Sequence, residues 1–384
     1  MDRSALRKEY QQPAPNILAD VCEKAATMTD VIDLSIGDPD LPTPAAITKA
    51  AFEKVAAGDS HYTSALGKPE LRQAIADLFT SRYQRPTTSD EVMVTVGAEH
   101  ALFLVLQAIV NPGEEVIVLE PSFSPYVNQV KLAGGVPVEV ATAAEHGFAL
   151  DLAAIKAAIT PKTKALVINS PNNPTGNALT AAEAAALGQL AIEHDFLILS
   201  DEIYADYLNP GVAFASPVTT APEHTIIVNG FSKTFAMTGW RIGYIVGPDW
   251  AIEAAAAVND SVTFSAPTPS QDAALYALAH YEETSAPVVN EFKERLTYLN
   301  QALAEVDWLK LTPAMGSIYL FPDIRPTGLD SLTFADELLK KAGILVVPGV
   351  AFGQPGEGFI RIAATQKLAV LKEAVARLKQ LTWN

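Results

Sequence analysis

The stretch ALVINSPNNPTGNALTAAEAAALGQLAIEHDFLILS, residues 165–200, places two short apolar runs on either side of a helical segment. The runs at 165–169 and 196–200 are almost continuously apolar, which is typical of strands that are buried on both faces. Residues 181–194 between them have a helical pattern. Strands and helices that alternate in this way indicate an α/β fold with a mainly parallel sheet.

The same alternation continues on both sides of this stretch. A β-branched run at 92–96 precedes a helical pattern at 98–110, and further apolar runs lie at 115–119 and 225–229. We therefore expect a mainly parallel central sheet with helices on both faces, formed by residues 46–284.

The two ends of the chain differ from this middle part, and a length of 384 residues favours two domains. The elements expected near the C-terminus are a helix at 288–306, strands at 317–321 and 344–347, and helices near 332–342 and 368–381. Residues 1–45 are too short and too rich in proline to fold alone. We expect them to join residues 285–384 in a smaller, discontinuous α/β domain.

Charge and composition limit the classes of partner. The chain has 27 Lys and Arg residues against 44 Asp and Glu residues, a formal net charge of −17. An acidic surface repels phosphate backbones and anionic lipids, so neither nucleic acid nor a membrane is an expected partner. The same charge repels anionic small molecules, so a site for such a substrate must carry its own cations.

Cysteine and histidine usage excludes several kinds of site. Cys22 is the only cysteine, which excludes an internal disulfide framework and a metal site of several thiolates. The six histidines lack metal-ligand spacing, so we expect no metal. The first residues are polar, without an apolar signal segment, and no apolar stretch reaches the roughly 18 residues of a spanning helix. We therefore expect a cytoplasmic protein.

Functional side chains follow the predicted strands, at the ends where ligands bind in open α/β sheets. In chain order these segments are Gly97-Ala98-Glu99-His100, Pro121-Ser122-Phe123, Asn172-Asn173, Asp201-Glu202-Ile203-Tyr204 and Ser232-Lys233. Together they offer a helix N-terminus, an aromatic ring, an amide, a carboxylate and an amine.

This set suits a phosphorylated aromatic aldehyde such as pyridoxal 5'-phosphate (PLP). A helix that begins near Ala98 offers free N–H groups to a phosphate, and Phe123 offers a flat face to a ring. Asn173 can donate to a ring hydroxyl, and an ionised Asp201 can keep a pyridine nitrogen protonated. Lys233 can form an imine with the aldehyde when its amine is neutral.

Residues 230–243, GFSKTFAMTGWRIG, resemble the PLP-attachment signature of the class I aminotransferases, which are fold-type I PLP enzymes. The segments SPNNPTG, DEIY and PSF and the late Arg361 occur in the order that this family shows. The resemblance extends from about Ile32 to the end of the chain. It implies the fold-type I architecture and PLP as the cofactor.

The resemblance also implies roles for individual residues. Lys233 would carry PLP as a Schiff base and act as the general base, with Asp201 and Tyr204 as the other catalytic residues. The residues implied in cofactor binding are Ala98, Glu99, Phe123, Asn173, Asp201, Tyr204, Ser232, Lys233 and Arg241. Those implied in substrate binding are Gly37, Phe123, Asn173 and Arg361, of which Arg361 would bind the α-carboxylate.

Tyr62, in HYTSALG, resembles the tyrosine that reaches the phosphate in the neighbouring subunit, which implies a homodimer. Two departures from the family pattern involve three residues: Gly230 stands where many members have serine, and Glu99 and His100 stand where lysine or glutamine is common. The stretch 258–271 contains no arginine that could hold a distal carboxylate.

These features predict an aminotransferase that moves an amino group from an L-amino acid, preferably aromatic or otherwise hydrophobic, to a keto acid such as 2-oxoglutarate. One alternative is a C–S β-lyase or another PLP eliminase, because the same residues support those reactions. A second is an aspartate or N-acyl-diamino acid aminotransferase. A PLP-dependent transcription regulator would need an additional winged-helix segment before the family region. We do not expect this class of function, because the resemblance begins near Ile32 and the chain is acidic.

Overall fold

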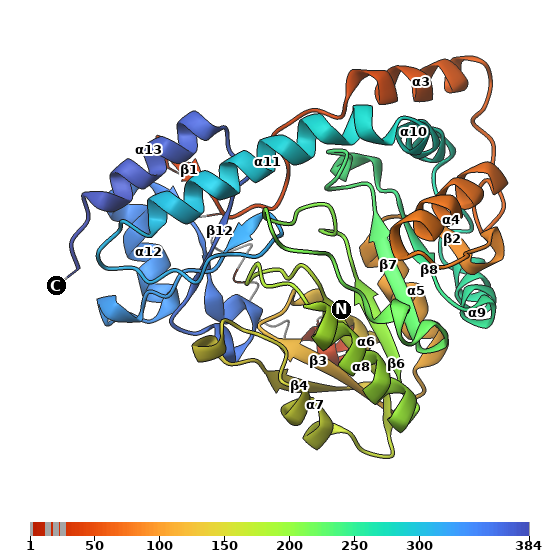
Figure 1. Ribbon diagram of the computed structural model, residues 1–384, viewed down its shortest axis with the longest axis horizontal. Coiled ribbons are helices and arrows are strands. Elements are labelled where there is room, and N and C mark those ends of the chain that lie inside the picture. Colours follow the sequence, from red (N-terminus) through yellow and green to blue (C-terminus); the bar gives the residue numbers. More distant parts are fainter. Residues whose placement is uncertain (1–2, 12–16, 18–22, 24–27, 384) are drawn as a thin grey trace.

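The computed structural model describes residues 3–11, 17, 23 and 28–383 (Figure 1). Cys22 lies outside the described residues. The main sheet has seven strands in the order β2-β8-β7-β6-β5-β3-β4. Their bounds are β2 (Val92–Thr95), β3 (Glu115–Glu120), β4 (Val136–Ala141), β5 (Thr163–Asn169), β6 (Leu197–Asp201), β7 (Thr225–Gly230) and β8 (Gly243–Val246).

This sheet confirms the predicted mainly parallel arrangement. Strand β8 is antiparallel to both of its neighbours, and the pairs among β7, β6, β5, β3 and β4 are all parallel. Every residue of β2, β6, β7 and β8 is buried, as expected for strands covered on both faces. The carboxyl ends of the parallel strands therefore meet at one edge of the sheet.

Helices cover both faces, because successive strand residues point to opposite sides. Val116 and Val118 of β3 pack with helices α5 (Ala98–Ile109), α6 (Pro125–Leu132) and α9 (Asp249–Asn259). Ile117, between them, packs against α7 (Leu152–Ala158) and α8 (Ala181–His194). A third cluster joins β2 and β8 to α3 (Ala45–Ala56), α4 (Pro69–Tyr83) and α10 (Thr268–Ala279).

The C-terminal part lies beside this sheet and includes α11 (Tyr281–Leu303), α12 (Ser331–Ala342) and α13 (Leu368–Lys379) (Figure 1). Three strands, β11 (Val347–Pro348), β12 (Ile360–Ala363) and β9 (Tyr319–Leu320), form an antiparallel sheet. A separate parallel pair joins β1 (Ile32–Asp33) to β10 (Ile344–Leu345). The chain's early residues at β1 thus lie against its late residues. Near the N-terminus the structure has the short α1 (Lys8–Gln11).

Several element boundaries differ from the sequence prediction. Helix α11 begins at Tyr281 rather than at 288, and Pro287 lies inside it, although proline usually marks the first turn of a helix. The strand expected at 344–347 is two strands, β10 and β11, separated at Val346. Strands β4 and β8 were not predicted. Most of β4 is partly or fully exposed, so it lacks the continuous apolar pattern of a buried strand.

Candidate active site

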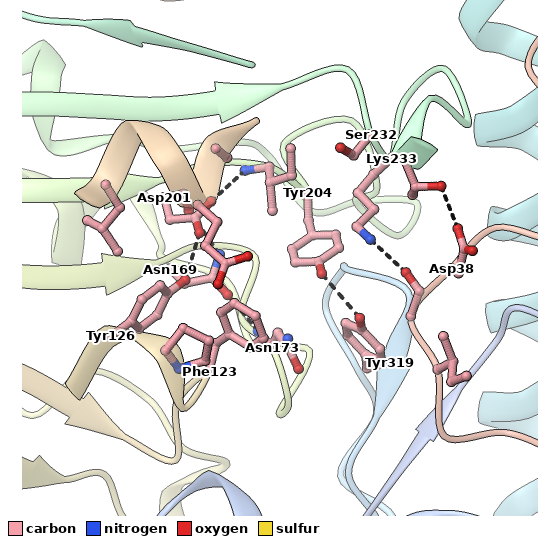
Figure 2. A pocket seen from close by; sticks show the side chains of 18 of the residues that line it. Asp38, Phe123, Tyr126, Asn169, Asn173, Asp201, Tyr204, Ser232, Lys233 and Tyr319 are labelled. Atoms are coloured by element: carbon pink, nitrogen blue, oxygen red, sulfur yellow. Dashed lines mark hydrogen bonds between the residues drawn. The ribbon is translucent and has the colours of Figure 1, made fainter. Parts of the chain in front are cut away.

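A cavity of about 420 Å³ lies at the carboxyl ends of the parallel strands (Figure 2). Eleven of the twelve predicted site residues line it: Gly37, Ala98, Glu99, Phe123, Asn173, Asp201, Tyr204, Ser232, Lys233, Arg241 and Arg361. These residues come from segments that are far apart in the sequence. The cavity forms where strand ends of the main sheet meet the segment after β1 and the C-terminal strands.

Lys233 follows β7 and points toward the segment that leads from β1 to α3 (Figure 2). Its Nζ donates a hydrogen bond to the carbonyl oxygen of Gly37, at 2.6 Å. A carbonyl is a weak partner compared with a carboxylate, so this contact leaves the amine available to a ligand.

Asp201 is the last residue of β6, and its carboxylate is held from two sides. Tyr126 donates its hydroxyl to Oδ2 at 2.7 Å, and the backbone N–H of Ile203 donates to Oδ1 at 3.1 Å. Burial raises the pKa of Asp201 to about 6, although both hydrogen bonds and the charge of Lys233 act to lower it. A buried carboxylate of this kind is stabilised by a ligand cation, such as a protonated pyridine nitrogen.

Arg361, in β12, is buried and tightly oriented. Its guanidinium carbon lies 4.3 Å from the ring centroid of Tyr319 and 4.8 Å from that of Phe352. Nη2 donates to the carbonyl oxygen of Ser35 and Nη1 donates to Oδ1 of Asn173. Among the described residues, none accepts a hydrogen bond from the buried Nε. An orphaned donor on a fixed guanidinium suits an anionic ligand such as a carboxylate.

The contact with Arg361 also fixes the amide of Asn173. Because Oδ1 accepts from Nη1 at 3.0 Å, the Nδ2 group must lie on the other branch of the amide and is a donor. The backbone N–H of Asn173 donates to Oδ1 of Asn169 at 2.7 Å, which holds this loop at the end of β5. Asn173 can thus donate to an oxygen on a bound ring.

Two tyrosines meet at the wall of the cavity. The hydroxyl groups of Tyr204 and Tyr319 lie 3.3 Å apart (Figure 2). Burial raises the pKa of Tyr204 well above its usual range, so the hydroxyl stays protonated and can donate to a ligand oxygen.

The N-terminus of α5 forms a potential anion site. Gly97 precedes it with φ 86°, a conformation that favours glycine. Gly243 lies so close that a Cβ there would be 2.6 Å from the N–H nitrogen of Ala98. Arg241 lines the cavity nearby and is exposed, with Nη1 donating to the carbonyl oxygen of Thr238 at 3.0 Å. The helix N-terminus, Ser232 and Arg241 could together bind a phosphate.

Tyr62 is the one predicted site residue that does not line the cavity. Its side chain is 86% exposed, and its ring contacts that of Phe264 edge to face, at 5.3 Å between centroids. Within this single chain Tyr62 therefore contributes nothing to the site.

Sequence reasoning missed seven polar residues that line the cavity: Ser35, Asp38, Tyr126, Gln129, Asn169, Thr238 and Tyr319. Asn169 could have been found, because it is the last residue of the apolar run ALVIN and therefore lies at a strand end. Tyr319 lies in the apolar run at 318–321 and resembles a core position, and Tyr126 lies beyond the strand end at 115–119, in a mixed stretch without a distinguishing pattern. Asp38 accepts from the Thr238 hydroxyl at 2.7 Å, a contact between segments 200 residues apart.

Within the described part of the chain, no group of three or more His, Cys, Asp or Glu residues could hold a metal ion. None of the described helices combines the length and apolar character needed to cross a membrane.

Comparison with known proteins identifies relatives that are named as aminotransferases. The family model for aminotransferase class I and II matches residues 29–378. The aspartate/prephenate aminotransferase of Thermus thermophilus is 41% identical over 383 residues, which cover 98% of each chain. Aromatic-amino-acid aminotransferase 2 of Thermococcus litoralis is 37% identical, again over 98% of each chain. The solved structure of Thermus thermophilus aspartate aminotransferase with maleate has a TM-score of 0.92 at 40% identity, covering 98% of this chain and 99% of that one.

Proposed function

Since this chain belongs to the class I and II aminotransferases, we propose that its cavity transfers an amino group from a hydrophobic L-amino acid to a keto acid. Aromatic donors are the preferred class, and 2-oxoglutarate is the proposed acceptor. The observation that carries this proposal is the convergence of Lys233, the buried Asp201 and the orphaned Nε of Arg361 on one cavity.

The residues present fit PLP, the cofactor typical of this family. Asp201 would pair with the pyridine nitrogen, Asn173 and Tyr204 would donate to the ring oxygen, and Phe123 would cover the ring. The start of α5 at Ala98 and Glu99, with Ser232 and Arg241, would hold the phosphate. When bound, PLP supplies an electron sink for the negative charge left at the substrate Cα.

Lys233 has two proposed tasks. Its Nζ would hold the cofactor through the aldehyde carbon and would give up this position to the substrate amine. The free amine would then act as the base that takes the substrate Cα proton and as the acid that gives it back. The Gly37 carbonyl, 2.6 Å from Nζ, orients the amine toward this position.

Arg361 is proposed to bind the substrate α-carboxylate. Packing between two aromatic rings fixes the guanidinium plane, so little side-chain freedom is lost on binding. Because every amino acid and keto acid carries an α-carboxylate, this contact sets the substrate class and leaves the side chain to be selected elsewhere.

The charges that line the cavity favour a donor without an acidic side chain. Among the described residues, the cations that line the cavity are Lys233, Arg241 and Arg361, and each already has a proposed partner. The other ionisable side chains that line it, Asp38, Glu99 and Asp201, are acidic and would repel a distal carboxylate. The dicarboxylic acceptor must then be tolerated through hydroxyl groups or water.

The named relatives include aspartate and aromatic aminotransferases, so the donor preference needs a direct test. We expect kcat/KM with 2-oxoglutarate to be higher for phenylalanine and tyrosine than for aspartate, with methionine and alanine in between. An aspartate lead of tenfold, about 1.4 kcal/mol, would refute the preference. Product formation without any keto acid would instead support the β-lyase alternative, which the comparisons do not favour.

We propose further that the enzyme is a cytoplasmic homodimer whose Tyr62 reaches the partner's site, which the exposure of Tyr62 and Phe264 supports. Light scattering would measure the oligomeric state, and cell fractionation would show the compartment. The division into 46–284 and 1–45 with 285–384 also remains a proposal, supported by the pairing of β1 with β10.

A further inference from the structure

The backbone around Lys233 is an irregular turn that depends on contacts from outside. Residues 231–237 follow β7 without forming a helix, and Ala236 has φ 50°, a conformation that is unfavourable for a residue with a Cβ. Such a turn keeps one geometry only when its surroundings hold it. The segment that follows β6 provides two of these contacts.

Tyr207 holds Lys233 itself. Its hydroxyl donates to the backbone carbonyl oxygen of Lys233 at 2.7 Å. The side chain is 1% exposed, and its ring packs edge to face on Phe292 at 5.7 Å. Burial and the nearby Asp206 raise the pKa of Tyr207 well above its usual range, so the hydroxyl remains a donor.

Asp206 holds the next residue. Its Oδ2 accepts hydrogen bonds from the hydroxyl groups of Thr234 at 2.8 Å and Tyr281 at 2.7 Å. Its Oδ1 pairs with Arg82 at 2.5 Å, and Arg82 also donates to Tyr281 at 2.9 Å. Contacts from helices α4 and α11 thus hold the carboxylate in place, and its hydrogen bond with Thr234 holds the turn.

Neither Asp206 nor Tyr207 lines the cavity, so neither can touch a ligand there. Both belong to the segment whose earlier residues, Asp201 and Tyr204, do line it. The segment 201–207 can therefore contact a ligand through Asp201 and Tyr204, and it contacts the backbone of Lys233 through Tyr207. Its geometry sets how far the Lys233 amine lies from a ring that is bound at Asp201.

We propose that Tyr207 and Asp206 are positioning residues that hold the Lys233 turn in register with Asp201, an inference that rests on the proposed function. When a catalytic group is misplaced by about an ångström, the chemical step becomes much slower. Substrate binding through Arg361 does not depend on this turn and should not change. Loss of the Tyr207 hydroxyl should therefore lower kcat and leave KM for the amino acid unchanged.

The test compares Tyr207→Phe with Thr225→Val in the full chain loaded with PLP. Thr225, at the other end of β7, is buried and donates its hydroxyl to the carbonyl of Ala221 at 2.8 Å. Both variants lose one hydrogen bond from a hydroxyl of a buried residue to a backbone carbonyl, but only the first loses a contact with Lys233. We expect kcat to fall about tenfold in Tyr207→Phe, within the range for a small misplacement, and to change less than about twofold in Thr225→Val.

Hydrogen–deuterium exchange of peptide 231–237, measured with and without PLP, gives a readout that does not depend on activity. Exchange there should be faster in Tyr207→Phe and in Thr234→Val, which removes the bond to Asp206, and unchanged in Thr225→Val. Equal effects in the control, or a fall in kcat without faster exchange in this peptide, would overturn the inference. A wild-type protein without transaminase activity would instead refute the proposed function, and the exchange result would stand separately.

Discussion

Asp201→Asn should make the PLP-free protein more stable at neutral pH, although it should abolish most activity. Burial raises the pKa of Asp201 from 3.8 to about 6, so the folded state binds this proton more tightly than the unfolded chain does. Below pH 4 the carboxyl group is neutral in both states. As the pH rises through 4 to 6 the unfolded chain loses its proton first, and the folded state loses stability relative to it.

The size of the effect follows from the pKa difference. About two pKa units, at 1.36 kcal/mol each, amount to about 3 kcal/mol lost between pH 4 and pH 7. Asparagine is neutral throughout and avoids this loss. It can accept only one of the two hydrogen bonds from Tyr126 and Ile203, which costs about 1 kcal/mol at every pH. The variant should thus be less stable than wild type by about 1 kcal/mol at pH 4 and more stable by about 2 kcal/mol at pH 8.

Urea unfolding of the PLP-free wild type and variant at pH 4, 6 and 8 measures this crossover. Asp330→Asn is a control for which the stability change has the opposite sign. Hydrogen bonds from Thr333 lower the pKa of Asp330, so the variant that lacks this carboxylate should become less stable than wild type as the pH rises. Saturation with PLP should reverse the order for Asp201→Asn, since the pyridine cation then stabilises the carboxylate. A stability difference that stays constant from pH 4 to pH 8 would refute the reasoning.

Further changes test the same site. Tyr126→Phe removes a hydrogen bond that lowers the pKa of Asp201, so the stability of the PLP-free variant should fall more steeply between pH 4 and pH 8 in urea titrations. Lys233→Ala should still bind PLP, seen as a dialysis-sensitive yellow colour, but lose borohydride labelling and turnover. Arg361→Ala should lower kcat/KM for all amino and keto acids together, by about tenfold to a hundredfold. Arg361→Lys is its charge-conserving control, and an effect confined to one substrate would contradict the assigned role.

Most of the main sheet could be predicted, because strands that are buried on both faces have continuous apolar runs in their sequence. The same logic located Asp201 and Lys233, since residues after such runs must lie at one edge of the sheet. Strand β4 lies at the edge and is partly exposed, so its sequence, VPVEVA, lacks the pattern. Strand β8 begins with Gly243, so its apolar run is only the three residues 244–246, shorter than the five-residue runs that identified the other strands.

The packing around the functional groups could not be predicted from the sequence. Phe352 lies in a short turn and Tyr319 in a two-residue strand, and neither position shows that its ring will contact Arg361. Tyr207 follows Asp206 in the sequence and is buried in the fold, and its sequence position does not show that its hydroxyl will contact Lys233. Such partners are set by tertiary contacts, because they join segments separated by long stretches of sequence.

Burial of Asp201 connects stability with function in this fold. The desolvation that raises its pKa weakens the PLP-free protein, and the same low-polarity surroundings strengthen its attraction to a ring cation. Tyr126 and Ile203 hold the carboxylate at a fixed place, so a bound ring meets a partner that needs no rearrangement. Under the proposed function, a bound ring cation would recover the free energy that the protein loses by burying this carboxylate. Cofactor affinity and the pH-dependent weakness of the PLP-free protein should therefore change together in any variant that alters the burial of Asp201.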